Sequence, residues 1–501
     1  MTQQPSLQQR LHQAHVLAQQ GRLIEALSLI ERTPAKDRPA VQPLQVELLK
    51  ALGRLGEALA IRREQARAEP RSVVAHHNLA SLLGDLGRNV EAVEAARRAI
   101  ANGGQAPETW LVLARALSAA SRHDEAAEAF RCALARRPAY VDAVRELSQL
   151  IWMRGGDREA TIAPVLTALE AAPADPGLLE CLAVVLKYTG VEPREAWTRV
   201  TERAAVAGLR AGAVELAASQ LALEFDPVLA VSHARAATQL TPLNVGAWTG
   251  LAEALLAANA LDEALDLLTQ LGALPEPDQK ALALYSTALR LTGADDLVGV
   301  NDFDGLVGAA RIDVPDGWPS LEAYLRDLAV ALNAQHAYAN HPLGQSLRHG
   351  AQTPVDLRLV ADPVIQAFFT AIDGPIRRRL QALGTGSDPV RRRNTGNYRL
   401  NGCWSVRLSP GGFHEPHVHQ KGWLSSACYI EVPPVVDGEG REGWLGLGAP
   451  PFKTLAPLAP VRYEKPEAGK LVLFPSCMWH GTVPFSGDQP RLTVAFDLVP
   501  A

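Results

Sequence analysis

A short sequence motif recurs through the first 295 residues of this 501-residue chain. An acidic residue is followed by alanine, often with a glycine nearby, in a segment rich in Ala, Leu, Glu and Arg. Successive alanines are 32 to 36 residues apart, and one gap of 68 is twice 34, with Ala230 halfway. These alanines are Ala26, Ala58, Ala92, Ala126, Ala160, Ala196 and Ala264. A period of about 34 residues in helix-forming sequence predicts a stack of helix pairs.

Prolines keep the same period, and they lie at Pro70, Pro138, Pro173 and Pro242. The whole pattern resembles the tetratricopeptide repeat. A small alanine lets the two helices of a pair cross closely, and a proline ends the second helix because it cannot continue one. The resemblance implies an all-α solenoid of about eight repeats over residues 1–296, whose concave face binds a protein or peptide. The alternative is an arm for dimerisation or scaffolding, so a homo-oligomer stays open.

The sequence changes character near residue 297, where Gly, Pro and Asp interrupt the helical period. Helices are expected over 321–335 and 362–383, and strand signals dominate from residue 397 onward. Short strands separated by Gly and Pro are typical of a sandwich or jelly roll. We therefore expect a second domain over residues 297–501, built from strands with flanking helices.

Histidines gather in this second domain, where residues 414–419 read His-Glu-Pro-His-Val-His. Imidazole is the commonest side-chain metal ligand. Two residues at i and i+2 on a strand share a face, so His417 and His419 could hold one ion. His480, from a neighbouring strand, could complete the set and leave other coordination positions open, as in non-haem iron sites. His414 and Glu415 are reserve ligands.

The strand expected over 397–408 alternates polar and apolar residues with period two. Its polar side either lines a wet pocket or faces solvent, and the sequence leaves both open. That side carries Arg399, Asn401, Cys403, Ser405 and Arg407. A second strand follows the histidines and places Ser425 and Tyr429 on one face.

Arg491 and Thr493 are i and i+2 on the last expected strand, so they share a face. The guanidinium fork binds a carboxylate through two parallel hydrogen bonds, which suits a buried carboxylate beside a metal. The alternative for a single arginine is a surface salt bridge.

Taken together, the pattern resembles the iron(II)- and 2-oxoglutarate-dependent oxygenases with a double-stranded β-helix. More narrowly, it resembles a group of bacterial 2-oxoglutarate oxygenases that often follow tetratricopeptide repeats. The resemblance spans about 297–501 and rests on several short motifs. They include Trp404-Ser-Val-Arg407, Gly411-Gly-Phe-His414, His417-Val-His419, Gly422-Trp-Leu-Ser425, Trp479-His480-Gly-Thr482 and Pro490-Arg491-Leu-Thr493.

The resemblance implies that His417 and His480 bind Fe(II), and that Arg491, helped by Thr493, binds the far carboxylate of 2-oxoglutarate. With O2 as the other cosubstrate, the implied activity is hydroxylation. Contacts to cosubstrate or substrate are expected from Arg399, Ser405, Arg407, Ser425 and Tyr429. The chain departs from the wider superfamily at His419, where Asp or Glu is usual. His419 is therefore a metal ligand, a residue that orients a ligand without binding the metal, or a substrate contact.

Composition narrows the remaining functions. A net charge of −5 gives no reason to expect nucleic acid. No apolar run reaches about 18 residues, so no membrane span is expected. The polar N-terminus has no signal-peptide core, and five scattered cysteines without CxxC spacing fit a reducing compartment. We expect a cytoplasmic protein.

The main prediction is an oxygenase that hydroxylates a protein or peptide residue recruited by the repeats. Three other hypotheses stay open. The chain could be a repeat scaffold carrying a decayed oxygenase domain, a cupin-type metal enzyme that does not use 2-oxoglutarate, or an oxygenase with a small-molecule substrate.

Overall fold

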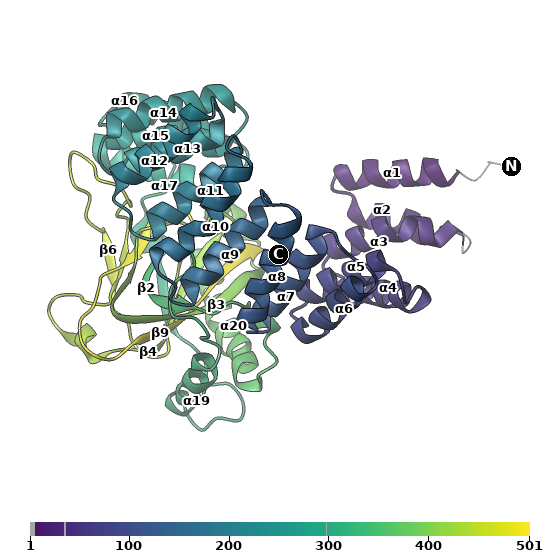
Figure 1. The fold of residues 1–501 in the computed structure, drawn as a ribbon. Coiled ribbons are helices and arrows are strands. Elements are labelled where there is room, and N and C mark those ends of the chain that lie inside the picture. Colours follow the sequence, from purple (N-terminus) through teal and green to yellow (C-terminus); the bar gives the residue numbers. More distant parts are fainter. Residues whose placement is uncertain (1–5, 35–36, 297) are drawn as a thin grey trace. The chain divides into compact units, whose positions relative to one another are not determined.

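A computed structural model of the chain describes residues 6–34, 37–296 and 298–501 (Figure 1). The chain forms two compact units, Met1–Arg137 and Pro138–Ala501. The domain boundary expected near residue 297 stays a prediction, and residue 297 itself lies outside the described residues.

The described part of the first unit consists of four helix pairs joined by short turns. They are α1 (Leu7–Gln19) with α2 (Leu23–Glu31), α3 (Arg38–Ala51) with α4 (Leu55–Ala68), α5 (Val73–Asp85) with α6 (Asn89–Ala101), and α7 (Pro107–Ala119) with α8 (His123–Arg136).

The second unit begins with four further pairs and one more helix. They are α9 (Val141–Met153) with α10 (Arg158–Ala171), α11 (Pro176–Tyr188) with α12 (Pro193–Val206), α13 (Gly212–Ala222) with α14 (Pro227–Leu240), α15 (Val245–Ala257) with α16 (Leu261–Gly272), and then α17 (Gln279–Thr292). The helical repeat predicted from the 34-residue period is confirmed.

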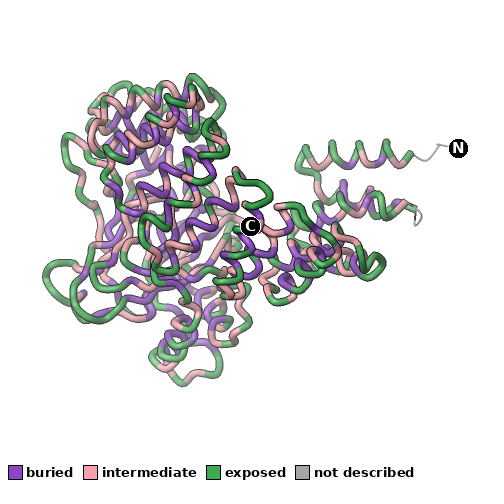
Figure 2. Tube along the Cα trace, in the orientation of Figure 1, coloured by how far each residue is buried: buried purple, intermediate pink, exposed green. Residues whose placement is uncertain are grey.

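The fourth residue of each second helix is buried. Figure 2 shows buried and exposed positions alternating along the repeat helices. The fourth residue is alanine in seven pairs, and all seven alanines have 0% exposure: Ala26, Ala58, Ala92, Ala126, Ala196, Ala230 and Ala264. The prediction was wrong at Ala160, which is exposed. Helix α10 starts at Arg158, so its fourth residue is Thr161, which is buried instead.

Turns and prolines set the ends of these helices. Gly21 and Gly87 adopt a left-handed backbone with φ of 75° and 69°, a conformation that glycine reaches without strain. Pro70 and Pro242 each lie two residues beyond the last residue of their helix, as expected for a residue that cannot continue one.

The rest of the second unit combines two antiparallel sheets with helices. The six-stranded sheet has the order β1-β7-β4-β9-β3-β2 and the three-stranded sheet the order β6-β5-β8. The strands are β1 (Gly308–Arg311), β2 (Leu347–Gln352), β3 (Tyr398–His414), β4 (Leu424–Glu431), β5 (Leu445–Leu447), β6 (Arg462–Glu464), β7 (Lys470–Pro475), β8 (His480–Thr482) and β9 (Arg491–Pro500). The helices are α18 (Phe303–Leu306), α19 (Leu321–Asn333), α20 (Pro363–Leu383) and 3-10 turns at Leu357–Leu359, Arg391–Arg393 and Pro434–Asp437.

Helices α19 and α20 cover one face of the large sheet. Alternate residues of β9, including Val494 and Phe496, join the hydrophobic core with these helices. The residues between them, Arg491, Thr493 and Ala495, line a pocket on the other face. The period-two alternation of β9 thus separates a helix-packed core from a candidate site.

Strand β3 contains a bulge that exchanges its two faces. Leu400 pairs with Leu498, but the next regular pair is Cys403 with Phe496, so β3 has one extra residue in this interval. Gly402 lies in the extra stretch, with φ of 123°. After the bulge, Ser405 shares the helix-covered face with Cys403.

The repeat helices of the second unit contact its sheet domain directly. The carbonyl of Met153, at the end of α9, accepts hydrogen bonds from the backbone N–H groups of Ala339 and Asn340. The Arg348 guanidinium lies 4.8 Å from the ring centre of Tyr188, at the end of α11.

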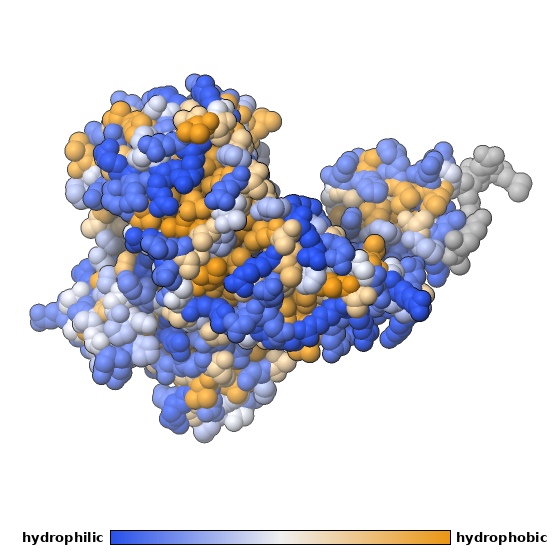
Figure 3. Space-filling view, in the orientation of Figure 1, coloured by the Kyte–Doolittle hydropathy of each residue, from blue (hydrophilic) through white to orange (hydrophobic). Residues whose placement is uncertain are grey.

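The surface shows hydrophobic side chains in patches among hydrophilic ones on the face drawn in Figure 3. Among the described residues, no helix combines the length and apolar character needed to cross a membrane.

Candidate metal centre

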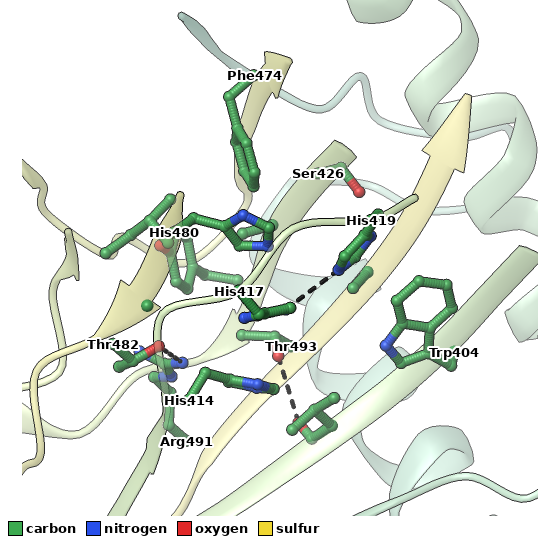
Figure 4. Close-up of a pocket in the computed structure, with 16 residues that line it drawn as sticks. Trp404, His414, His417, His419, Ser426, Phe474, His480, Thr482, Arg491 and Thr493 are labelled. Atoms are coloured by element: carbon green, nitrogen blue, oxygen red, sulfur yellow. Dashed lines mark hydrogen bonds between the residues drawn. The ribbon is translucent and has the colours of Figure 1, made fainter. Parts of the chain in front are cut away.

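Three histidines converge in the pocket between the two sheets (Figure 4). His417, His419 and His480 each bring a ring nitrogen to within 4.8 Å of the other two. The backbones of His417 and His480 form an antiparallel bridge, with N–O distances of 3.0 and 3.1 Å. The structure therefore brings together the three residues predicted as metal ligands.

The Nδ1 atom of each ring is already held by a group that only accepts hydrogen bonds. His417 Nδ1 lies 2.9 Å from the Glu415 carbonyl oxygen. His480 Nδ1 lies 2.9 Å from the Met478 carbonyl oxygen, and His419 Nδ1 lies 2.6 Å from Asp497 Oδ1. Each Nδ1 therefore carries a proton, and in the neutral ring the lone pair is on Nε2.

Two of these lone pairs face each other, because His417 Nε2 and His419 Nε2 are 3.1 Å apart. Burial and the neighbouring His419 ring lower the pKa of His417 to about 3, so the ring is neutral at physiological pH. A neutral His417 ring that holds its proton on Nδ1 presents its Nε2 lone pair to His419. A cation held between the two Nε2 atoms would bind both lone pairs.

Asp497 completes this end of the site, and the sequence analysis missed it. Its carboxylate is buried, with 8% exposure, and accepts a 2.8 Å hydrogen bond from Ser425 in addition to the bond from His419. A carboxylate behind a metal-bound histidine fixes the ring and raises its basicity. The signal was available, since Asp497 is six residues after Arg491 on one strand and therefore shares its face.

Arg491 lies at the other end of the pocket, with 4% exposure. Its guanidinium donates to the Gly443 carbonyl and, over 3.2 Å, to Thr482 Oγ1. Among the described residues, neither its Nε nor the hydroxyl of Tyr429 has a hydrogen-bond partner. The Tyr429 ring centre is 5.7 Å from the Arg491 guanidinium carbon. Burial raises the pKa of Tyr429 to about 12, so this hydroxyl keeps its proton. Two buried donors are thus free to bind an anionic group.

The reserve ligands lie in different places. His414 lines the pocket, and its ring stacks on His417 with centres 5.7 Å apart. On a regular strand His414 would have faced away from His417, but β3 ends at His414 and Pro416 follows. Glu415 forms a 2.6 Å ion pair with Arg348 instead.

The structure does not bring every predicted contact to the pocket. Thr493 and Tyr429 line it, and Ser425 lies at its edge beside His419. Ser405 is on the opposite face of β3, where it bonds to the Thr493 carbonyl at 3.1 Å and contacts His336.

Arg407 follows the same face and reaches Asn333 Oδ1 at 3.4 Å. Arg399 precedes the bulge, Asn401 lies within it, and both are exposed. The polar side of the strand is therefore neither a pocket wall nor a uniformly solvated face. Trp404 and Val406 line the pocket instead.

The pocket encloses about 520 Å³, counting the open solvent at its mouth. Its walls between the two ends are largely apolar, and they include Val406, Leu445, Phe474 and Ala495. The arrangement can hold a cation at one end and a carboxylate at the other, between largely apolar walls.

Comparison with protein families gives a match over residues 402–497, to the family described as "Putative 2OG-Fe(II) oxygenase". The matched segment contains the three histidines, Arg491 and Asp497. The comparison with curated proteins found no match.

Comparison with solved structures gives helical repeat proteins. MamA 41-end from Desulfovibrio magneticus RS-1 is 14% identical, covers 32% of this chain and 92% of its own, and has a TM-score of 0.28. The APC/C hetero-tetramer Cut9-Hcn1 is 17% identical over 57% of this chain and 56% of its own, with a TM-score of 0.32. The repeat assignment rests on the helix pairs themselves, not on these alignments.

Proposed function

We propose that this chain is an Fe(II)- and 2-oxoglutarate-dependent oxygenase that hydroxylates a residue of a protein or peptide. The observation that carries the proposal is a group of three histidines whose ring nitrogens lie within 4.8 Å of one another, with a hydrogen-bond acceptor at each Nδ1. The family match over residues 402–497 supports the same class.

His417, His419 and His480 would hold the iron. The structure supports His419 as the third ligand, because Asp497 turns its Nε2 toward the other two. In the wider superfamily a carboxylate is usually one of the metal ligands. Here the carboxylate of Asp497 would instead bond to a ligand, His419. Asp497 would return one negative charge to a site built from neutral rings.

Arg491 would bind the far carboxylate of 2-oxoglutarate, with Tyr429 and Thr493 beside it. Its unpaired Nε and the unpaired Tyr429 hydroxyl support this assignment, because a buried donor without a partner is costly and a bound carboxylate removes that cost. The Gly443 carbonyl and Thr482 hold the other side of the guanidinium fork.

When bound, iron and 2-oxoglutarate supply the oxidising chemistry, in which O2 converts 2-oxoglutarate to succinate and carbon dioxide and places one oxygen atom on a substrate C–H bond. The chain's own residues bind, orient and shield. The rings are held by their Nδ1 bonds before the metal arrives, and the apolar walls limit water in the pocket.

The fold proposed for residues 297–501 is a double-stranded β-helix. The large sheet supplies Arg491, and the small sheet supplies His480 from β8. The pocket lies between these two antiparallel layers, which supports the assignment.

The substrate would be recruited by the repeats of the first unit. In the second unit, α9, α11 and α17 contact the sheet domain, so part of the repeat surface there is used within the chain. The four helix pairs of the first unit would bind the protein or peptide on their concave face.

The test is succinate formation from 2-oxoglutarate by the purified protein with Fe(II), ascorbate and O2, with and without peptides from a bacterial lysate. We expect turnover that rises with the peptides and disappears in His480→Ala. Metal binding at the histidines without any use of 2-oxoglutarate, with every peptide pool, would contradict the proposal.

A further inference from the structure

The residues beside the three histidines point away from the pocket, toward the repeat helices. Val418 lies between His417 and His419, and Trp479 directly precedes His480. Both pack against one hydrophobic cluster formed by helices α13 to α17. In extended chain, neighbouring side chains point to opposite sides, so each histidine directed at the pocket has a neighbour directed at the repeats.

Trp479 makes the stronger of these two contacts. It is buried, with 4% exposure, among residues such as Leu251 of α15, Leu268 of α16 and Leu284 of α17. Its indole N–H donates to Thr287 Oγ1 over 2.9 Å and to the Ala283 carbonyl over 3.1 Å. Packing and polar contacts therefore fix this indole in one orientation.

Helix α17 holds the other side of the same strand as well. Arg290, on the same face of α17 as Ala283 and Thr287, donates to the Gly448 carbonyl and, over 3.0 Å, to the Ala459 carbonyl. The backbone N–H of Gly448 in turn donates to the Trp479 carbonyl over 2.7 Å. The residue before Gly448, Leu447 of β5, pairs with His480 in the small sheet.

Three residues of one helix thus hold both the indole and the sheet neighbour of the strand that carries His480. We infer that α17 is a positioning element of the metal centre, and that Trp479 is the positioning residue through which it acts on His480. This inference rests on the proposed function, since it assigns the support of one proposed metal ligand to the last helix of the repeat array.

The loss of metal affinity expected from removing Trp479 or Thr287 follows from what is typical of groups that orient metal ligands. Groups that orient metal ligands from outside typically change metal affinity by about 10- to 100-fold when they are removed. Trp479 acts one residue away from the ligand, so we expect the lower end, about tenfold, for Trp479→Phe. For Thr287→Val, which keeps the packing and removes only the hydroxyl, we expect about threefold.

The experiment uses Co(II) as the probe, because its visible absorption reports both affinity and ligand geometry. The full-length protein and its variants are titrated with Co(II), and their unfolding is followed by circular dichroism. Matched controls exist for both substitutions. Trp423→Phe removes a buried indole that donates to the Val390 carbonyl over 2.8 Å. Thr161→Val removes a buried helical hydroxyl bonded to the carbonyl four residues earlier.

We expect Trp479→Phe and Thr287→Val to weaken Co(II) binding and shift its absorption, while each control leaves both unchanged at similar stability. If both variants match their controls while the wild type binds Co(II) through His480, the inference is wrong and the proposed function stands. If the wild type binds no Co(II) at these histidines, the proposed function fails and the inference with it. Thr287→Val keeps the test valid should Trp479→Phe not fold.

Discussion

The two ends of the pocket differ in whether their buried nitrogen and oxygen donors already have hydrogen-bond partners. At the histidine end (His417, His419 and His480), every Nδ1 has a hydrogen-bond partner, so Nε2 is the nitrogen left on each ring for a ligand. At the arginine end (Arg491 and Tyr429), two buried donors have no hydrogen-bond partner in the part of the chain that the structure describes. The first end is set for one small cation, whereas the second is set for a group with several acceptor oxygens. The difference shows how one pocket can select two chemically unlike ligands.

The comparison predicts the largest effect at the histidine end. His417→Ala removes one of three converging nitrogens, and we expect metal affinity to fall by about 100-fold or more, beyond the loss seen for outer groups. The measurement is a Co(II) or Fe(II) titration. His414→Ala is the matched control, because His414 lines the same pocket but bonds to Ser346. Equal losses in both variants would show that the ligand set has been misassigned.

At the arginine end, Arg491→Gln should affect 2-oxoglutarate and leave the metal in place. Loss of a buried charge-assisted hydrogen bond costs about 3 kcal/mol, or roughly 100-fold in the KM for 2-oxoglutarate. Arg407→Gln, on the other face of β3, should leave this KM unchanged. If Arg407→Gln raised this KM and Arg491→Gln did not, 2-oxoglutarate would bind on the helix-covered face of β3 instead.

Asp497→Asn should reduce metal affinity by about 10- to 30-fold, because His419 loses a charged acceptor while the shape of the site is kept. Ser425→Ala, which removes only a hydroxyl beside the same carboxylate, should have a smaller effect. Metal titration of the two variants ranks them. If Asp497→Asn kept full metal affinity, either His419 would not be a metal ligand or Asp497 would not support it.

Tyr429→Phe should give the smallest effect, at the arginine end. One neutral hydrogen bond is worth about 1 kcal/mol, so the KM for 2-oxoglutarate should rise roughly fivefold with metal affinity unchanged. Steady-state succinate formation measures this. A weaker metal site in Tyr429→Phe would mean that the two ends are not independent.

Periodicity was sufficient to predict the helices, because a repeated buried position leaves a repeated small residue. It failed at Ala160 because the helix there starts one residue later and Thr161 takes the buried position. Composition alone does not distinguish two adjacent small residues at the start of a helix.

The candidate site was predictable where side chains share a strand face, as with His417 and His419 or Arg491 and Thr493. It was not predictable through β3, because the single extra residue near Gly402 exchanges the faces and places Ser405 and Arg407 under the helices. A bulge is a local backbone feature, whereas alternation assumes an unbroken strand. The contact of Trp479 with α17 could not be predicted either, because its hydrogen-bond partner, Thr287, is 192 residues earlier in the chain.

That long separation bears on the order in which the molecule forms. Chains fold from the N-terminus as they are made, and a contact spanning 192 residues is slow to close. The helix that receives Trp479 is complete before the strand that carries His480 has been synthesised. The last helix of the repeat array would therefore serve as a template on which the end of the chain assembles, and the candidate metal centre would form late.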